Sequence, residues 1–261
     1  METKNVIINE MSLNLPSYYQ QVESMPDDPA DSIPFMVQTG NASCLVLAKP
    51  ITMDQAIPFE QRAAIDGIRS FLQENQGIIE VNGEEGYIYS IVKTLRKPSG
   101  VQYCLTYQQF FDRDHILMVQ GFFDEIGTTG MRDAVVYELS IRKGMIGSDS
   151  DPSAGWAKDP YDPLYMQGAL MNLSEQEQFD DKFPGHPLSM CRELVRTIIQ
   201  NRKKERSRWL FGFLKPKETK RKQQQSNGVK HQTAPKKTSM IRNSSDSYAD
   251  GSSVAMESFI S

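Results

Sequence analysis

The sequence lacks the residue patterns that identify most enzymes and metal proteins. It contains no phosphate-binding loop, no Gly-x-Gly-x-x-Gly motif and no nucleophile elbow. Its three cysteines, Cys44, Cys104 and Cys191, lie far apart and form no Cys-x-x-Cys pair. We therefore expect reduced, mostly buried thiols in a cytoplasmic protein, and we assign no catalytic residue, no metal ligand and no cofactor.

Long apolar runs are also missing. No stretch approaches the roughly 18 consecutive apolar residues that a membrane-spanning helix needs. Residues 1–16 lack the apolar run of a signal peptide, so we expect a cytoplasmic chain that is at most peripheral to a membrane.

Charge is distributed unevenly along the chain. Residues 1–150 carry 11 Lys and Arg against 20 Asp and Glu, and residues 151–200 carry 4 against 8. Residues 201–261 carry 14 against 5, so the formal net charge of −4 conceals an acidic body and a basic end. Hydrophobic residues make up only 39% of the sequence, with the shortfall concentrated in the basic end. These shifts predict an extended, flexible N-terminus at 1–32, an α+β sandwich domain at 33–145, a loop and helical extension that packs on it at 146–200, a basic-aromatic segment at 201–222, and a disordered tail at 223–261.

The central domain has a clear order of predicted elements. Two short apolar runs around Thr39-Gly40-Asn41 predict a β-hairpin, and the spacing of Ala64, Ile65 and Ile68 predicts a helix that Gly77 closes. A second helix begins near Thr129 and ends at Gly144, with Met131, Val135 and Leu139 in one stripe. Between the helices, short turn-forming separators predict a meander of four antiparallel strands, at Ile78–Val81, Tyr87–Leu95, Val101–Phe111 and Ile116–Phe123. The fold class is therefore α+β, with a four- to six-stranded antiparallel sheet flanked by helices.

Both faces of this sheet carry apolar side chains. In the fourth strand, for example, Leu117 and Val119 alternate with Ile116 and Met118. A sheet with one wetted face would alternate more cleanly between apolar and polar residues. Either both faces are covered, or one of them is an exposed binding surface.

This order of hairpin, helix, four strands and helix resembles the Mog1/PsbP/DcrB group of α/β/α sandwich domains, over roughly residues 33–145. The resemblance implies the fold and a non-catalytic role, since members of that group serve mostly as binding proteins, extrinsic subunits or chaperones. Their roles differ too widely to imply one particular partner.

Three features follow the domain. Residues Leu164–Met171 predict a short helix, and Ser174 with Glu177 fits a capping box. A stronger helix is predicted at Leu188–Gln200, whose continuous apolar face must dock on another surface. If this helix covers the sheet, the binding surface lies elsewhere; if it stands free, its apolar face is the interaction site.

Isolated polar residues give weaker signals. The Asp112–His115 cluster is interpreted as a solvated turn rather than a metal site, because a single turn supplies too few converging ligands. His186 is interpreted as a helix-capping or hydrogen-bonded structural residue, and Cys104 as core filler.

The basic-aromatic segment is the strongest functional signal. Its basic residues would attract an anionic membrane surface, a protein partner or, as a further alternative, nucleic acid, and its aromatic residues could enter an interface or stack on bases. The plain alternative is that the segment only solvates the end of a helix and packs on the domain. The predicted contact residues are Arg202, Lys203, Lys204, Arg206, Arg208, Trp209, Phe211, Phe213, Lys215 and Lys217.

Taken together, the sequence predicts a cytoplasmic, bacterial, non-enzymatic interaction module. It would act as an adaptor or chaperone-like protein that binds a protein partner through an apolar sheet or helix face. The alternative is a peripheral membrane-surface or nucleic-acid docking protein that acts through residues 202–222. The identity of the partner and the oligomeric state do not follow from the sequence.

Overall fold

The computed structural model describes residues 2–213 except 98–99, 113 and 148–149, and for residues 203–213 it describes the backbone alone. Contacts divide the chain into two units, Met1–Glu205 and Arg206–Ser261, and the seven-stranded sheet and its cores belong to the first. The predicted disordered tail at 223–261 lies outside the described residues. None of the described helices is both long and apolar enough to cross a membrane.

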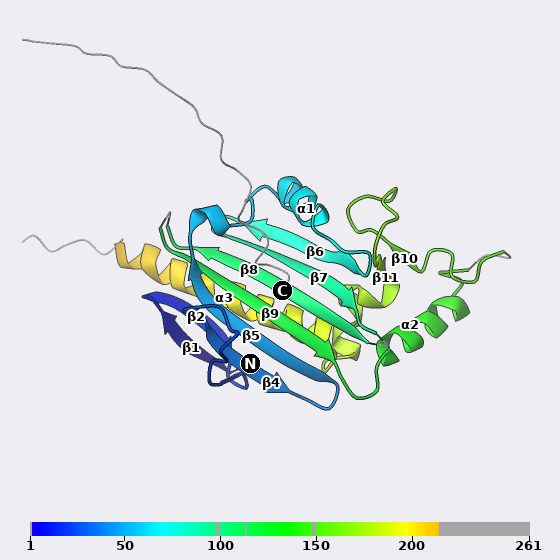
Figure 1. The fold of residues 1–261 in the computed structure, drawn as a ribbon, viewed down its shortest axis with the longest axis horizontal. Helices are drawn as coiled ribbons and strands as arrows, with labels where there is room; N and C mark the ends of the chain where they lie inside the picture. Colours follow the sequence, from blue (N-terminus) through cyan, green and yellow to red (C-terminus); the bar gives the residue numbers. More distant parts are fainter. Residues whose placement is uncertain (1, 98–99, 113, 148–149, 214–261) are drawn as a thin grey trace, which may run out of the picture. The chain divides into compact units, whose positions relative to one another are not determined.

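A seven-stranded antiparallel sheet forms the centre of the fold, with strand order β3-β4-β5-β9-β8-β7-β6 (Figure 1). The strands β6 to β9 are the predicted meander, and β4 with β5 is the predicted hairpin, so the α+β class is confirmed. The sheet exceeds the predicted four to six strands because β3 pairs with the outer edge of β4. The strands span Gln20–Gln21 (β3), Ile33–Gln38 (β4), Ala42–Ile51 (β5), Gln76–Glu84 (β6), Tyr87–Leu95 (β7), Val101–Phe110 (β8) and Ile116–Glu125 (β9).

The part of helix α3 (Pro187–Phe213) that belongs to the first unit, up to Glu205, runs across one face of this sheet, behind the strands in Figure 1. Its residues Leu188, Leu194 and Ile198 are buried in the main core, together with Phe123 and Tyr103 from the sheet. The docking predicted for Leu188–Gln200 therefore takes place on the sheet. The helix extends past the predicted end at Gln200, because the next residues are mostly Lys, Arg and Glu, which favour helix and contain no breaker before Gly212.

The N-terminus shares this face with α3. Residues expected to be flexible form a hairpin of β1 (Thr3–Ile8) and β2 (Met11–Pro16), whose turn at Asn9 and Glu10 has positive φ at both positions. Such a turn matches the right-handed twist of the two strands. Leu13 and Leu15 alternate with polar residues and are buried in the main core, which explains why the hairpin is held.

The opposite face is covered only in part by the described residues. Helix α1 (Gln61–Arg69) packs Ala64 and Ile65 onto β6 and β7, where they form a second, smaller core. A turn of 3-10 helix, η1 (Met53–Gln55), precedes it, and the backbone N–H of Ile57 donates to Gln108 on β8. The cross-strand row of Leu45, Phe122, Cys104 and Val92 remains half-buried.

The edge strand β6 is covered by the segment that follows α2. The Ala169 N–H donates to the Gln76 carbonyl at 2.8 Å, and the Tyr161 hydroxyl bonds to the backbone of Val81. The predicted helix at Leu164–Met171 does not form, because this segment bonds to the strand instead, and Gly168 has φ +73°. Short elements complete the segment: β10 (Ala157–Lys158), β11 (Met171–Asn172), η2 (Leu173–Glu175) and η3 (Glu177–Lys182). Covering an edge in this way blocks its pairing with another chain.

Gly77 does not close the first helix as predicted, because α1 ends at Arg69 and Gly77 lies in β6. Its surroundings show how closely the segment after α2 approaches that strand. A Cβ at Gly77 would lie 1.8 Å from the Ala169 carbonyl oxygen, whereas a Cβ at Gly67 in α1 would meet nothing within 4 Å. We expect Gly77→Ala to lower the free energy of unfolding by at least about 2 kcal/mol. Gly67→Ala should raise it by about 0.5–1 kcal/mol, because alanine favours helix. Urea unfolding midpoints of the two variants measure this difference, and equal midpoints would contradict the close approach.

Candidate interaction surface

Helix α2 (Met131–Arg142) presents its apolar side to solvent. Its buried residues are Arg132, Val136 and Ser140, which succeed one another at intervals of four. One position earlier in each turn, Met131, Val135 and Leu139 are 52%, 40% and 45% exposed. An ordinary surface helix of a globular protein buries its apolar stripe, so α2 is inverted. The sequence predicted this stripe correctly but not the direction in which it faces.

The start of α2 is fixed by Gly130. This residue, rather than the predicted Thr129, is the N-cap, and it has φ 74°. Its N–H donates to Glu125 Oε1 at 2.8 Å. Glycine tolerates this left-handed conformation without steric cost, so the helix can turn sharply away from the end of β9.

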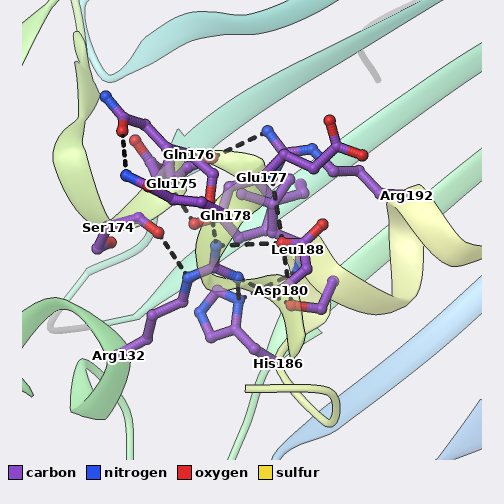
Figure 2. Close-up of polar contacts among 12 residues, drawn as sticks. Arg132, Ser174, Glu175, Gln176, Glu177, Gln178, Asp180, His186, Leu188 and Arg192 are labelled. Atoms are coloured by element: carbon purple, nitrogen blue, oxygen red, sulfur yellow. Dashed lines mark hydrogen bonds and ion pairs between the residues drawn. The ribbon is translucent and has the colours of Figure 1, made fainter. Parts of the chain in front are cut away.

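Arg132 explains the orientation of the helix (Figure 2). Its side chain is only 1% exposed, and its guanidinium donates to Ser174 O at 2.7 Å, Ser189 Oγ at 2.9 Å, Gln176 O at 3.1 Å and Asp180 Oδ1 at 3.2 Å. Burial lowers the pKa of Arg132, and the charge of Asp180 opposes that change. A buried guanidinium is tolerated only when its donors are paired, so α2 must keep this polar side inward.

Asp180 accepts from a second arginine. Arg192 of α3 donates to Asp180 Oδ1 at 3.2 Å, to Glu80 Oε2 at 2.9 Å and to the Glu175 carbonyl at 2.8 Å. The other oxygen of Asp180 lies 3.5 Å from Arg196. One buried carboxylate on η3 therefore connects α2, α3 and, through Arg192, the sheet. We call the set of Arg132, Asp180 and Arg192 the arginine clamp.

Glu175 extends the clamp into the sheet. Its carboxylate accepts from Lys93 Nζ at 2.7 Å and from the Tyr103 hydroxyl at 3.0 Å. Burial and the charge of Glu175 raise the pKa of Tyr103 well above its usual value, so its hydroxyl keeps the proton that it donates. Glu175 also forms a capping box with Asn172. This box has the three-residue spacing of the one predicted for Ser174 and Glu177, but it lies two residues earlier in the chain. The carboxylate is thereby satisfied by strand, loop and helix-cap groups.

His186 lies against the clamp and has the capping role that the sequence predicted. Its Nδ1 accepts from the backbone N–H of Leu188 at 3.3 Å at the start of α3. Burial, with the nearby charges of Arg132 and Arg192, lowers the pKa of His186 to about 3. The ring is therefore neutral at neutral pH and serves as an acceptor.

The other polar residues singled out in the sequence do not converge. Asp112 and His115 form an exposed turn in which carboxylate and ring lie 2.8 Å apart, as predicted. Cys104 is half-buried, and burial raises the pKa of its thiol to about 11, which disfavours the nucleophilic thiolate. Within the described part of the chain, no three or more His, Cys, Asp or Glu residues are grouped so that they could hold a metal ion.

The exposed apolar side of α2 is the densest of its kind among the described residues. Of the 16 large hydrophobic side chains that are exposed, seven lie between Met131 and Met166. Five of them belong to α2 or follow it directly, and Glu138 and Arg142 lie among them as an ion pair. We call these five apolar side chains and the two charged ones the α2 ridge: Met131, Val135, Leu139, Ile141 and Met145 with Glu138 and Arg142. Contiguous exposed apolar residues mark interaction sites more often than scattered ones do.

The basic-aromatic segment is only partly described. Arg202 is buried, donates to the Glu85 carbonyl at 2.7 Å, and lies over the Tyr87 ring at 5.3 Å, so it holds α3 on the β6–β7 turn. Its predicted contact with a partner stays a prediction. The residues Lys203, Lys204, Arg206, Arg208, Trp209, Phe211 and Phe213 belong to α3, whereas Lys215 and Lys217 lie outside the described residues.

Comparison with known proteins adds a resemblance of fold. No protein-family model matches the chain, and no curated protein matches it. The solved structure of the Saccharomyces cerevisiae Ran-binding protein Mog1p is similar at 7% identity and a TM-score of 0.36, over 53% of this chain and 84% of that one. A mutant of protein Mog1 is similar at 8% identity and a TM-score of 0.35, over the same shares. Both of these structures are of Mog1 proteins, which belong to the group that the order of predicted elements resembles.

The arginine clamp predicts a large effect from one uncharged substitution. Asp180→Asn preserves the shape of the side chain but removes the charge that faces Arg132 and Arg192. Because both guanidinium groups would stay buried without it, we expect the free energy of unfolding to fall by about 3–5 kcal/mol. Arg62→Ala, which breaks an exposed ion pair with Asp66 in α1, should cost less than about 0.5 kcal/mol. Urea unfolding compares the two, and similar losses would show that the clamp does not hold the fold.

Proposed function

We propose that the protein is a non-catalytic interaction module that binds a protein partner through the α2 ridge. The observation that carries this proposal is the inversion of α2, which buries an arginine and exposes Met131, Val135 and Leu139. Leaving three large apolar side chains in water forgoes a stabilisation of roughly 1 kcal/mol or more for each. A partner that covers the ridge recovers this free energy.

The clamp supports the proposal because it makes the ridge rigid. Arg132 is bonded to η2, η3 and α3, so α2 cannot turn about its axis to hide its apolar side. A helix that is already ordered loses little conformational entropy on binding. Anchors spaced by one turn on such a helix suit a partner with an apolar groove or a matching helix.

The ridge also agrees with the chain's other surfaces. The apolar face of α3 is occupied by the sheet, so α3 does not serve as the binding face that one sequence-based alternative required. The remaining half-buried row on the sheet is flanked by the polar residues Gln102 and Thr94. The α2 ridge, which the sequence did not single out as a binding surface, is therefore a better candidate than the sheet row.

Photo-crosslinking in cells that naturally produce the protein tests this role. We expect p-benzoylphenylalanine placed at Val135 to give a discrete adduct, because the ridge is covered there. The same probe at Phe71, an exposed apolar residue just after α1, should give none. The mass of the adduct identifies its second component. No adduct at Val135, or equal adducts at both positions, would overturn the proposed function.

We propose a second candidate, binding to an anionic membrane surface, for the basic-aromatic segment. It is favoured by the continuity of α3 through Phe213, which puts five basic and three aromatic residues of the segment on one helix. Each basic residue near an anionic leaflet contributes about 1 kcal/mol, and amphipathic helices with aromatic residues enter the headgroup region.

Vesicle sedimentation tests this second candidate. We expect the full chain to bind vesicles that contain phosphatidylserine and not pure phosphatidylcholine, with binding lost at about 1 M salt. Replacing Lys203, Lys204, Arg206 and Arg208 by glutamine should weaken binding more than about 100-fold. Salt-sensitive binding to single-stranded RNA without vesicle binding would assign the segment to nucleic acid instead. No binding to either would remove both candidates.

A further inference from the structure

The α2 ridge has a charge pair at its centre. Glu138 Oε1 and Arg142 Nε lie 2.8 Å apart, one helical turn apart, and both side chains are exposed. At about 3.6 residues per turn, these two residues run along the middle of the solvent side of α2. Val135 and Leu139 lie to one side of them, and Ile141 lies to the other. The pattern is thus a central pair of opposite charges, with no net charge, between two apolar borders.

A surface with this pattern is complementary to a second copy of itself. A two-fold axis that crosses the ridge between Glu138 and Arg142 sets the second helix antiparallel to the first. Glu138 of each copy then faces Arg142 of the other copy, which gives two such pairs across the interface. On one border Leu139 meets Leu139 of the second copy, and on the other Ile141 meets Ile141 of the second copy. Antiparallel helices also align their dipoles favourably.

We infer that the protein forms a symmetric dimer through the α2 ridge. This inference rests on the proposed function and names its partner as a second copy of the chain. The charges define the antiparallel orientation, and the apolar borders supply the burial. One helix from each copy gives an interface at the low end of the size range, below about 1,200 Å² in total, which belongs to reversible complexes.

A charge-swap experiment on the full chain tests the dimer. At about 200 μM, above the dissociation constants usual for small interfaces, light scattering should give about twice the chain mass of 29.6 kDa. Glu138→Arg places an arginine opposite Arg142 of the other copy at both pairs, so this variant should be a monomer. Arg142→Glu should be a monomer for the same reason. An equimolar mixture of the two variants should return to the dimer mass, because every Arg then faces a Glu.

The matched control is Arg62→Glu, which inverts one charge of an exposed ion pair on α1. It should keep the mass of the unmodified protein. A monomeric unmodified protein, single variants that remain dimers, or a mixture that stays monomeric would each overturn the dimer. The two proposals fail separately. An adduct at Val135 with a different protein, found together with a monomeric mass, would leave the proposed function standing and remove the dimer, whereas no adduct at all would remove the proposed function.

Discussion

The fold depends on one buried carboxylate, that of Asp180, which both Arg132 and Arg192 contact. Burying two guanidinium groups costs several kcal/mol for each, and the cost is offset only where charge and hydrogen bonds are both satisfied. Asp180 supplies the charge, while backbone carbonyls of Ser174, Glu175 and Gln176 accept most of the remaining donors. The 3-10 turns that carry these carbonyls have few apolar residues of their own. The arginines therefore hold these turns in place, and the turns in return hold the two guanidinium groups.

This constraint acts at two points along α3. Near its start, Arg192 is tied to Asp180 and to Glu80 on β6, and ten residues later Arg202 is tied to the turn between β6 and β7. The apolar face between them then packs on the sheet without freedom to slide. Gly86 fits this arrangement, because a Cβ there would lie 1.9 Å from the Arg202 guanidinium. The same clamp fixes α2 through Arg132, so the direction in which its apolar side faces follows from the packing of α3.

Sequence reasoning predicted the parts of the fold that local pattern determines. The meander from β6 to β9 follows from its turn-forming separators, and the docking of α3 follows from its continuous apolar face. The hairpin of β1 and β2 was missed because its polar composition outweighed the alternation of Met11, Leu13 and Leu15, which was the available signal. The clamp was not predictable, since Arg132 and Asp180 are 48 residues apart and no local motif pairs them. The stripe of α2 was therefore visible in the sequence, but its exposure was not.

Two apolar surfaces remain uncovered among the described residues, and they differ in what a partner would gain. On the sheet, Phe122 and Cys104 stand between neighbouring strands that already remove most of their contact with water. On α2, Val135 and Leu139 project from a convex helix and keep 40% and 45% of their surface exposed. Because the hydrophobic free energy is proportional to the area removed from water, each side chain of the ridge contributes more on binding than one of the sheet row. The sheet row also carries no charged side chain that would fix a partner's orientation, whereas the charge pair of the ridge selects one. Free energy and specificity thus both favour the helix.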